Sequence, residues 1–231
     1  MQFTFKNKKI NIENFANDDD FFMKLIEQLP TELKVVEIGA HHGKFAKPIL
    51  EKFENALIIE GEDFNFQRLS NTLSMYKNKI QKHVVYKNSE NHNWFVAEGS
   101  GGNAVRLPLP NSPTVKREKM KKMKIKTISL ADINFNFDLI KIDCEGADFP
   151  ILQGATNLIS KNKPLIYFEH SGQHGANAHE YTCDDFFSFF EKQNYVLHLA
   201  NGKRFEKHMW NTDTEKKENS CNILAIPNGT A

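Results

Sequence analysis

Apolar runs and amphipathic stretches alternate in the first third of this chain, and that alternation restricts the folds open to it. Residues 34–38 and 56–59 are short apolar runs, whereas 44–53 and 63–76 place apolar residues three or four positions apart. The first pattern is typical of buried strands and the second of helices that pack one face. Strands that alternate with helices pair in parallel, so the chain is predicted to be an α/β protein.

The same alternation continues along the chain. Further strands are expected at 82–86, 94–97, 124–130, 137–143, 164–169, 195–199 and 222–226, and further helices at 147–159 and 184–191. These elements predict a mostly parallel sheet with helices on both faces. Ligands of such sheets bind outside the carboxyl ends of the strands.

Residues 1–30 are interpreted as an N-terminal strand and helix extension, and residues 31–231 as the main domain. The extension contains one helix, which begins after the acidic run 17–20 and ends before Pro30. Glycines and prolines are frequent between residues 98 and 122, and no periodicity is visible there. Long irregular segments of compact domains usually serve function, so this one is predicted to be a mobile loop beside a site.

Composition excludes several classes of protein. The formal net charge is only +1, so global charge does not indicate a nucleic-acid or anionic-membrane partner. The apolar runs are far shorter than the roughly 20 residues that cross a bilayer, and no signal-peptide pattern is present. Three widely separated cysteines without a C-x-x-C motif fit a reduced setting, so a cytoplasmic location is predicted.

The strand at 34–38 runs directly into the motif EIGAHHG at 37–43, and an acid, Glu60, follows the next strand. A glycine turn between a strand and a helix, with an acid about 20 residues further on, suits the binding of an adenosine ribose. Such glycines also turn chains that bind nothing. The residues expected to contact the nucleoside are Glu37, Gly39, Ala40, His41, Gly43, Glu60 and Gly61.

The charge at this turn discriminates between cofactors. A dinucleotide brings a pyrophosphate and normally meets G-x-G-x-x-G, whereas here Glu37 places a carboxylate at the strand end. S-adenosylmethionine has no phosphate and carries a cationic ammonium and sulfonium. The sequence therefore favours S-adenosylmethionine over NAD.

A second motif is more specific. The segment FDLIKIDCEGADFPILQGA at 137–155 resembles "iKiDvEGaE…vLkGa" of the FkbM-type methyltransferases. The turn at 37–43 is similar to the family's "D-x-G-A-n-x-G", and strands 164–169 and 222–227 look like two later family strands. The resemblance extends from about residue 34 to the end of the chain.

The resemblance implies a Rossmann-like class I methyltransferase with a mostly parallel seven-stranded sheet. It also implies dependence on S-adenosylmethionine and methylation of an oxygen on a sugar, polyketide or related metabolite.

Three residues at strand ends are candidates for positioning the acceptor or removing its proton: Asp143, Glu169 and His170. Asp143 is equally compatible with a structural role at the following turn. His170 begins a polar loop, 171–179, that is expected to border the acceptor. Asp148 is interpreted as structural, Glu145 is left open, and Lys141 is expected to pair with a carboxylate.

A metal is an alternative that the sequence does not favour. Asp143 and Glu169 offer oxygen ligands for Mg²⁺, but the histidines of the 171–179 loop have irregular spacing. No metal ligand is assigned.

Residues 116–126 hold seven cations in eleven positions. Such a run is more often a solvated flank than a site. Its functional interpretation is capture of an anionic small-molecule acceptor, such as a nucleotide-linked or phosphorylated sugar. A nucleic-acid partner is not expected, because no set of aromatic residues for base stacking is apparent.

The predicted function is S-adenosylmethionine-dependent O-methylation of a sugar or related small-metabolite hydroxyl. The alternatives are a non-catalytic nucleotide- or glycan-binding domain of the same fold and an NAD-dependent dehydrogenase. The sequence identifies neither the acceptor nor the oligomeric state.

Overall fold

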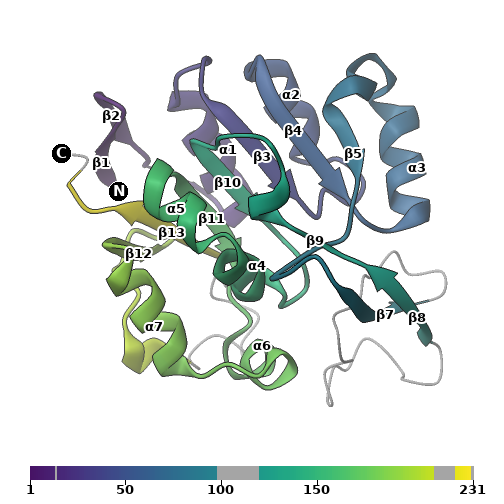
Figure 1. Cartoon of the computed structure of the whole chain (residues 1–231). Helices are drawn as coiled ribbons and strands as arrows, with labels where there is room; N and C mark the ends of the chain where they lie inside the picture. The colour runs from purple at the N-terminus through teal and green to yellow at the C-terminus, as the bar shows by residue number, and fades with distance from the viewer. Residues whose placement is uncertain (14, 98–119, 211–221, 230–231) are drawn as a thin grey trace.

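A computed structural model describes residues 1–13, 15–97, 120–210 and 222–229. Its centre is a seven-stranded sheet of order β12-β13-β11-β10-β3-β4-β5 (Figure 1). The strands are β3 (Lys34–Ile38), β4 (Asn55–Glu60), β5 (Ile80–Lys82), β10 (Leu139–Ile142), β11 (Leu165–Glu169), β12 (Tyr195–Leu199) and β13 (Asn222–Pro227). Only β13 runs antiparallel to its neighbours in this sheet. The predicted mostly parallel seven-stranded sheet of an α/β protein is therefore confirmed.

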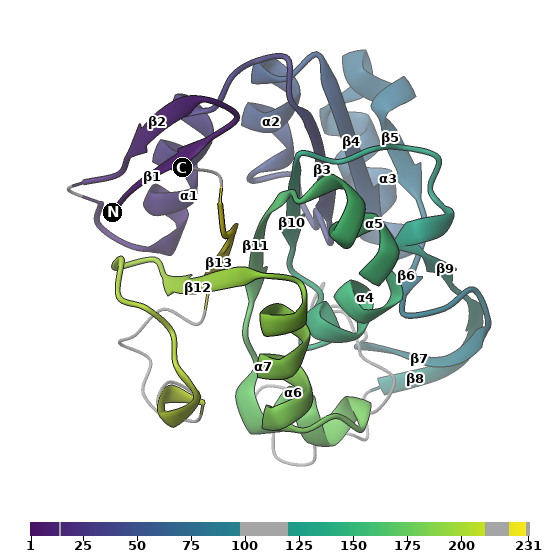
Figure 2. The same cartoon turned by 60° about the vertical axis from the view of Figure 1, so that its left-hand side comes forward.

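Helices cover both faces of the sheet (Figures 1 and 2). One face carries α1 (Asp18–Gln28), α2 (Ala46–Lys52) and α3 (Asp63–Thr72), and the other carries α4 (Asp148–Gly154), α5 (Thr156–Asn162) and α7 (Cys183–Lys192). Side chains of successive residues in the central strands point alternately into two hydrophobic cores, one on each face of the sheet. Val35 and Leu139 pack with α1 and α2, whereas Val36 and Ile140 pack with α4 and α7. Burial on both faces explains why these strands are continuous apolar runs in the sequence.

The first 30 residues share a core with the sheet. A hairpin of β1 (Gln2–Phe5) and β2 (Lys8–Asn11) precedes α1, whose N-cap is Asn17. Phe5, Ile10, Phe21 and Phe22 are buried in the same cluster as sheet residues such as Leu139. The hairpin and helix are thus packed onto one face of the sheet.

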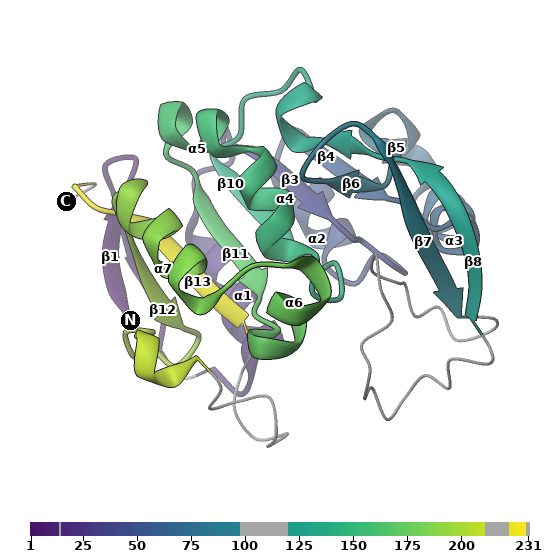
Figure 3. The ribbon, with the colours of Figure 1, turned by 60° about the horizontal axis from the view of Figure 1, so that its bottom comes forward.

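Two small two-stranded sheets lie beyond β5. β6 (Val85–Tyr86) pairs in parallel with β9 (Ile128–Ser129), and β7 (Asn91–Ala97) pairs antiparallel with β8 (Met120–Lys126). The β7–β8 ribbon projects from the end of the molecule beside α3 (Figure 3). Most of the predicted loop at 98–122 lies outside the described residues, and its last three residues belong to β8.

Several predicted elements are divided in the structure. The helix expected at 63–76 is α3 followed by a 3₁₀ helix, Ser74–Lys79, and the strand expected at 82–86 is split between β5 and β6. The helix expected at 147–159 is α4 followed by α5, with the interruption at Ala155, next to Gly154, which packs directly on the backbone of Lys87. Two other 3₁₀ helices are Leu130–Asp132 and Lys207–Met209.

The prediction of a polar loop at 171–179 is wrong. These residues form α6 (Gly172–His179), which buries Gly175, Ala176 and His179. Small residues make its contact with the rest of the protein, so the sequence shows no apolar stripe of helical period. Across the described residues, no helix has both the length and the apolar character needed to cross a bilayer.

Candidate functional site

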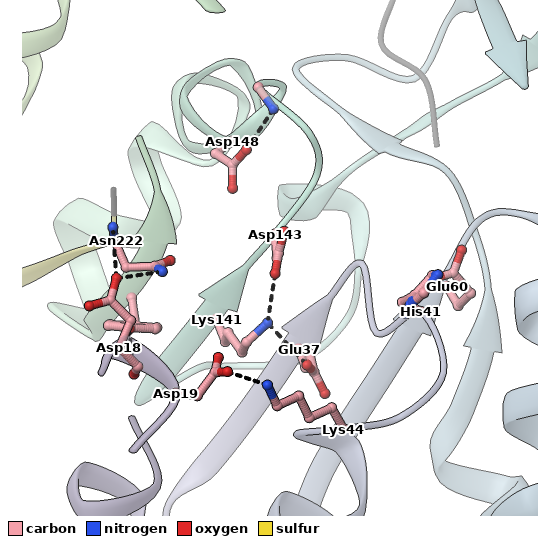
Figure 4. Close-up of polar contacts among 12 residues, drawn as sticks. Asp18, Asp19, Glu37, His41, Lys44, Glu60, Lys141, Asp143, Asp148 and Asn222 are labelled. Carbon is pink, nitrogen blue, oxygen red and sulfur yellow. Dashed lines mark hydrogen bonds and ion pairs between the residues drawn. The ribbon is translucent and has the colours of Figure 1, made fainter. Parts of the chain in front are cut away.

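The glycine turn at 37–43 and the acid Glu60 meet at the carboxyl edge of the sheet. The backbone amides of Gly39 and Ala40 donate hydrogen bonds of 3.0 and 3.2 Å to the carbonyl oxygen of Ile59. The next amide, that of His41, donates a 2.7 Å hydrogen bond to Oε2 of Glu60 (Figure 4). The glycine turn after β3 is therefore tied to the acidic end of β4, as the order of the motifs predicted.

The three glycines of these motifs occupy crowded positions. Gly39 has φ +81° and lies against the backbone of Asp143 at the end of β10. Gly43 donates its amide hydrogen to the carbonyl of Ala40, which closes the turn, and Gly61 packs against Val84. The turn is consequently compact and held against two neighbouring strands.

Glu60 is 2% exposed and anchors both loops. Its Oε2 accepts from His41, and its Oε1 accepts a 2.8 Å hydrogen bond from the amide of Glu62. Burial raises the pKa of Glu60, while these backbone hydrogen bonds favour the ionised form. Each carboxylate oxygen can accept a second hydrogen bond, so Glu60 retains capacity for hydroxyl groups.

Histidines border this turn. The ring of His41 stacks on that of His42 with centroids 3.6 Å apart, and His42 lies 3.3 Å from the guanidinium of Arg68. Burial, His41 and Arg68 lower the pKa of His42. The lowered pKa favours the neutral form of His42, and the two stacked rings form an aromatic surface beside the turn.

A buried cation lies beside the turn. Nζ of Lys141 is 3.2 Å from Oε1 of Glu37 and 3.6 Å from Oδ2 of Asp143 (Figure 4). Burial opposes the positive charge of Lys141, but the attraction of Glu37 and Asp143 outweighs burial and raises its pKa. The expected pairing of Lys141 with a carboxylate is confirmed, and it involves two carboxylates. The negative charge of Glu37 is thus largely offset.

Asp143 and Glu169 stand at the ends of adjacent strands, β10 and β11. Burial and the charges of Asp143 and Glu145 raise the pKa of Glu169 to about 8. Glu169 is accordingly a protonated acid at neutral pH. Asp148, interpreted as structural, is 1% exposed in the first turn of α4 and accepts a hydrogen bond from the amide of Gly146.

The side chain of His170 packs among aromatic residues on and beside α7. Its ring contacts those of Phe186, Phe205 and Trp210, and its Nε2 donates a 3.2 Å hydrogen bond to the carbonyl of Trp210. Burial lowers the pKa of His170 to about 4. A neutral imidazole whose Nε2 is hydrogen-bonded in this way serves as part of the aromatic core. Asp143 and Glu169 therefore lie at the same edge of the sheet, whereas His170 has different surroundings.

The first turn of α1 also reaches this edge, which the sequence did not indicate. Asp18 Oδ2 accepts hydrogen bonds from the backbone amide and Nδ2 of Asn222, at 3.3 and 2.9 Å. Tyr167 on β11 donates to the carbonyl of Asp18, and Asp19 pairs with Lys44 (Figure 4). The sequence predicted that a helix begins at the acidic run. It did not predict the position of that run at this edge, because the position depends on contacts with distant strands.

No cluster of three or more histidine, cysteine, aspartate or glutamate side chains is arranged to hold a metal ion in the described part of the chain. Cys144 and Cys183 are free thiols, and Cys221 lies outside that part. Of the basic run, residues 116–119 are likewise outside it, whereas Lys124 and Lys126 are exposed on β8.

Comparison with known proteins identifies the family. The model of the methyltransferase FkbM domain matches residues 14–197. The chain belongs to the FkbM methyltransferase family. The membership supports methyl transfer as the general activity.

Solved structures resemble this FkbM methyltransferase over most of its length. An FkbM methyltransferase from Methylobacillus flagellatus KT has 19% identity and a TM-score of 0.53, covering 91% of this chain and 48% of that chain. This chain therefore spans about half the length of the Methylobacillus protein. A precorrin-6y C5,15-methyltransferase from Geobacter metallireducens GS-15 has 10% identity and a TM-score of 0.45, covering 92% of each chain.

A third similar structure is a putative O-methyltransferase from Klebsiella pneumoniae, with 13% identity and a TM-score of 0.45. That similarity covers 95% of this chain and 84% of that chain. No curated protein matches the sequence. At 19% identity, the similarity to the Methylobacillus structure shows a shared fold.

Proposed function

We propose that this FkbM methyltransferase transfers the methyl group of S-adenosylmethionine to a hydroxyl group of a sugar or related small metabolite. The observation that carries the proposal is the hydrogen bond between His41 and Glu60, which joins a glycine turn to a carboxylate with spare acceptor capacity. Ribose hydroxyls are donors that such a carboxylate binds.

The charges at the carboxyl edge fit this donor. Glu37 is offset by Lys141, so the exposed negative charge near the turn comes from Asp143. A cationic donor is attracted to such an edge, whereas a pyrophosphate is repelled. When bound, S-adenosylmethionine supplies an electrophilic methyl group on a positively charged sulfur.

The residues of the chain have to orient the acceptor and take up its proton. The hydroxyl oxygen forms a bond to the methyl carbon, the carbon–sulfur bond breaks with its electron pair going to sulfur, and the hydroxyl proton passes to the carboxylate of Asp143. Asp143 is the proposed acceptor of that proton, and Glu169, which is protonated at neutral pH, is a proposed hydrogen-bond partner of the substrate, because both stand at strand ends facing the same edge. His170 faces Phe186, Phe205 and Trp210 instead, so we assign it no part in the proton transfer.

An acceptor that carries negative charge is part of the proposal. Lys124 and Lys126 are exposed on the projecting ribbon and offer two cations. The carboxylates at the strand ends disfavour phosphate close to the methylated hydroxyl. A nucleotide-linked sugar satisfies both conditions, because its phosphates are separated from most of its hydroxyls.

Calorimetry with S-adenosylhomocysteine tests donor binding. The wild-type protein is expected to bind, and Glu60→Ala is expected to weaken binding about tenfold or more, since a charged hydrogen-bond acceptor is lost. Glu62→Ala is the matched control: Glu62 accepts a backbone hydrogen bond from Asn65 in the same loop, as the N-cap of α3. Loss of that cap is expected to lower stability and leave affinity nearly unchanged.

Three results would contradict the proposal: no binding by the wild type, equal binding by Glu60→Ala, or tighter binding of NADH than of S-adenosylhomocysteine. Incubation of metabolite pools with isotopically labelled S-adenosylmethionine then tests catalysis. Donor binding without any labelled hydroxyl product would favour a non-catalytic binding domain.

A further inference from the structure

Lys141 occupies the centre of the sheet, where charged residues are uncommon. It lies opposite Glu37 of β3 and Tyr167 of β11 in the strand register, and it is 3% exposed. Besides its two carboxylate partners, its Nζ lies 4.7 Å from the centroid of the Phe45 ring. Burial of an ammonium group is unfavourable unless such partners surround it.

The two carboxylates that contact Lys141 differ in exposure. The Glu37 side chain is 1% exposed, whereas the Asp143 side chain is 47% exposed. Two negative charges and one positive charge leave a net charge of about −1 for the three residues. Because only Asp143 reaches the surface, it is the residue that presents this charge to a ligand.

The backbone of Asp143 is already fixed. Its amide donates a 3.0 Å hydrogen bond to the carbonyl of Ile38, and its own carbonyl is covered by Gly39. Residues 141 and 143 are two positions apart at the end of a strand, so they lie on the same face. Lys141 therefore reaches along the strand to Oδ2 of Asp143, which leaves Oδ1 for another partner.

We propose that Lys141 is a positioning residue, which holds the carboxylate of Asp143 in the orientation that meets the positive charge of the methyl donor. This inference rests on the proposed donor. It assigns Lys141 a role beyond neutralising Glu37. Under this inference, the carboxylate that attracts the cationic donor is that of Asp143 and not that of Glu37.

A double-mutant cycle in a Glu37→Gln background separates this role from simple charge balance. With Glu37 neutral, Lys141→Met leaves no unpaired buried charge, so the fold is retained. The four proteins are E37Q, E37Q/K141M, E37Q/D143N and E37Q/K141M/D143N. Calorimetry measures the affinity of each for S-adenosylmethionine and S-adenosylhomocysteine, and thermal unfolding confirms that each is folded.

We expect E37Q/K141M to bind about tenfold more weakly than E37Q, because the Asp143 carboxylate loses its orienting partner. E37Q/D143N should lose a similar factor. The triple variant should bind no more weakly than E37Q/D143N, because Lys141 acts through Asp143.

Two results would overturn the inference. Equal affinities of E37Q/K141M and E37Q would reduce Lys141 to a counter-ion of Glu37. If the loss of affinity in the triple variant equals the product of the losses in E37Q/K141M and E37Q/D143N, Lys141 does not act through Asp143. Neither result affects the proposed function, which is contradicted instead by no binding of the wild type, by equal binding of Glu60→Ala, or by tighter binding of NADH.

Discussion

Gly39 packs so closely on Asp143 that a Cβ atom at Gly39 would lie 1.9 Å from the carbonyl oxygen of Asp143. This contact joins the glycine turn after β3 to the end of β10. It makes the position of the turn dependent on the strand that carries Lys141 and Asp143. Any side chain at position 39 must separate the two.

Gly39→Ala is therefore expected to disrupt both stability and donor binding. A positive φ costs a non-glycine residue about 1–2 kcal/mol, and displacement of the β10 backbone adds to that. Gly229→Ala is the matched control, because Gly229 has φ +91° but nothing within 4 Å of the added Cβ. Urea unfolding of both variants measures the difference, and equal losses would show that the contact with Asp143 is unimportant.

His170 is expected to make stability depend on pH below neutrality. Its pKa is about 4 in the folded protein, against an ordinary value of 6.5, because burial disfavours the imidazolium form. As pH falls from 6.5 to 4, the unfolded chain takes up a proton that the folded chain does not, so stability is lost. The loss is about 3 kcal/mol in total.

His170→Phe should remove that loss. Urea unfolding at pH 7 and pH 4.5 should show a smaller decrease for His170→Phe than for the wild type, by about 2 kcal/mol. His174→Gln, at an exposed position on α6, serves as the control and should behave like the wild type. A decrease in His170→Phe as large as that of the wild type would contradict the burial argument.

Glu169 is expected to change the pH dependence of stability in the direction opposite to His170. Its pKa is about 8 in the folded protein, against an ordinary value of 4.5, so the folded chain keeps a proton that the unfolded chain has lost. Stability is therefore lost as pH rises from 4.5 to 8. Between pH 4.5 and 6.5 the effects of His170 and Glu169 oppose each other.

Glu169→Gln cannot ionise and should be more stable than the wild type at pH 8.5, with the difference shrinking toward pH 4.5. Thermal unfolding across this range measures the effect. Glu191→Gln, on the exposed side of α7, is the comparison. A difference between Glu169→Gln and wild type that does not change with pH would exclude Glu169 as the titrating group.

Asp18 and Asp19 are adjacent acids with different predicted contributions. Asp18→Ala removes the acceptor of two hydrogen bonds from Asn222, so it should lower the free energy of unfolding by about 1–3 kcal/mol. Asp19→Ala breaks an exposed ion pair with Lys44 and should cost less than about 1 kcal/mol. Urea unfolding distinguishes the two, and equal losses would contradict the anchoring role of Asp18.

The parallel strands could be predicted because burial on both faces leaves a strong signal. β3 and β12 have the bounds that their apolar runs predicted, and the edge positions of Glu37 and Glu60 followed from the strand ends. The break between α4 and α5 at Ala155 could not be predicted, since the helical spacing of apolar residues in 147–159 continues through it.

Within the candidate site, the motifs predicted that the functional residues lie at the carboxyl edge of the sheet. They did not predict which side chains contact one another there. A lysine at position 141 was expected to pair with a carboxylate, but the sequence does not show that Phe45 lies beneath it or that Asp143 is a second partner. His170 was grouped with Glu169 because the two are adjacent. Its burial among Phe186, Phe205 and Trp210 depends on residues up to 40 positions away.

The bonds between Asp18 and Asn222 join positions separated by 204 residues. During synthesis on the ribosome, α1 emerges long before β13 exists. Phe21 and Phe22 can pack on the hairpin and on strands that precede β13, but the hydrogen bonds of Asp18 with Asn222 form only after the end of the chain has been translated. The anchor of the first turn of α1 is therefore among the last contacts that a newly made chain can form.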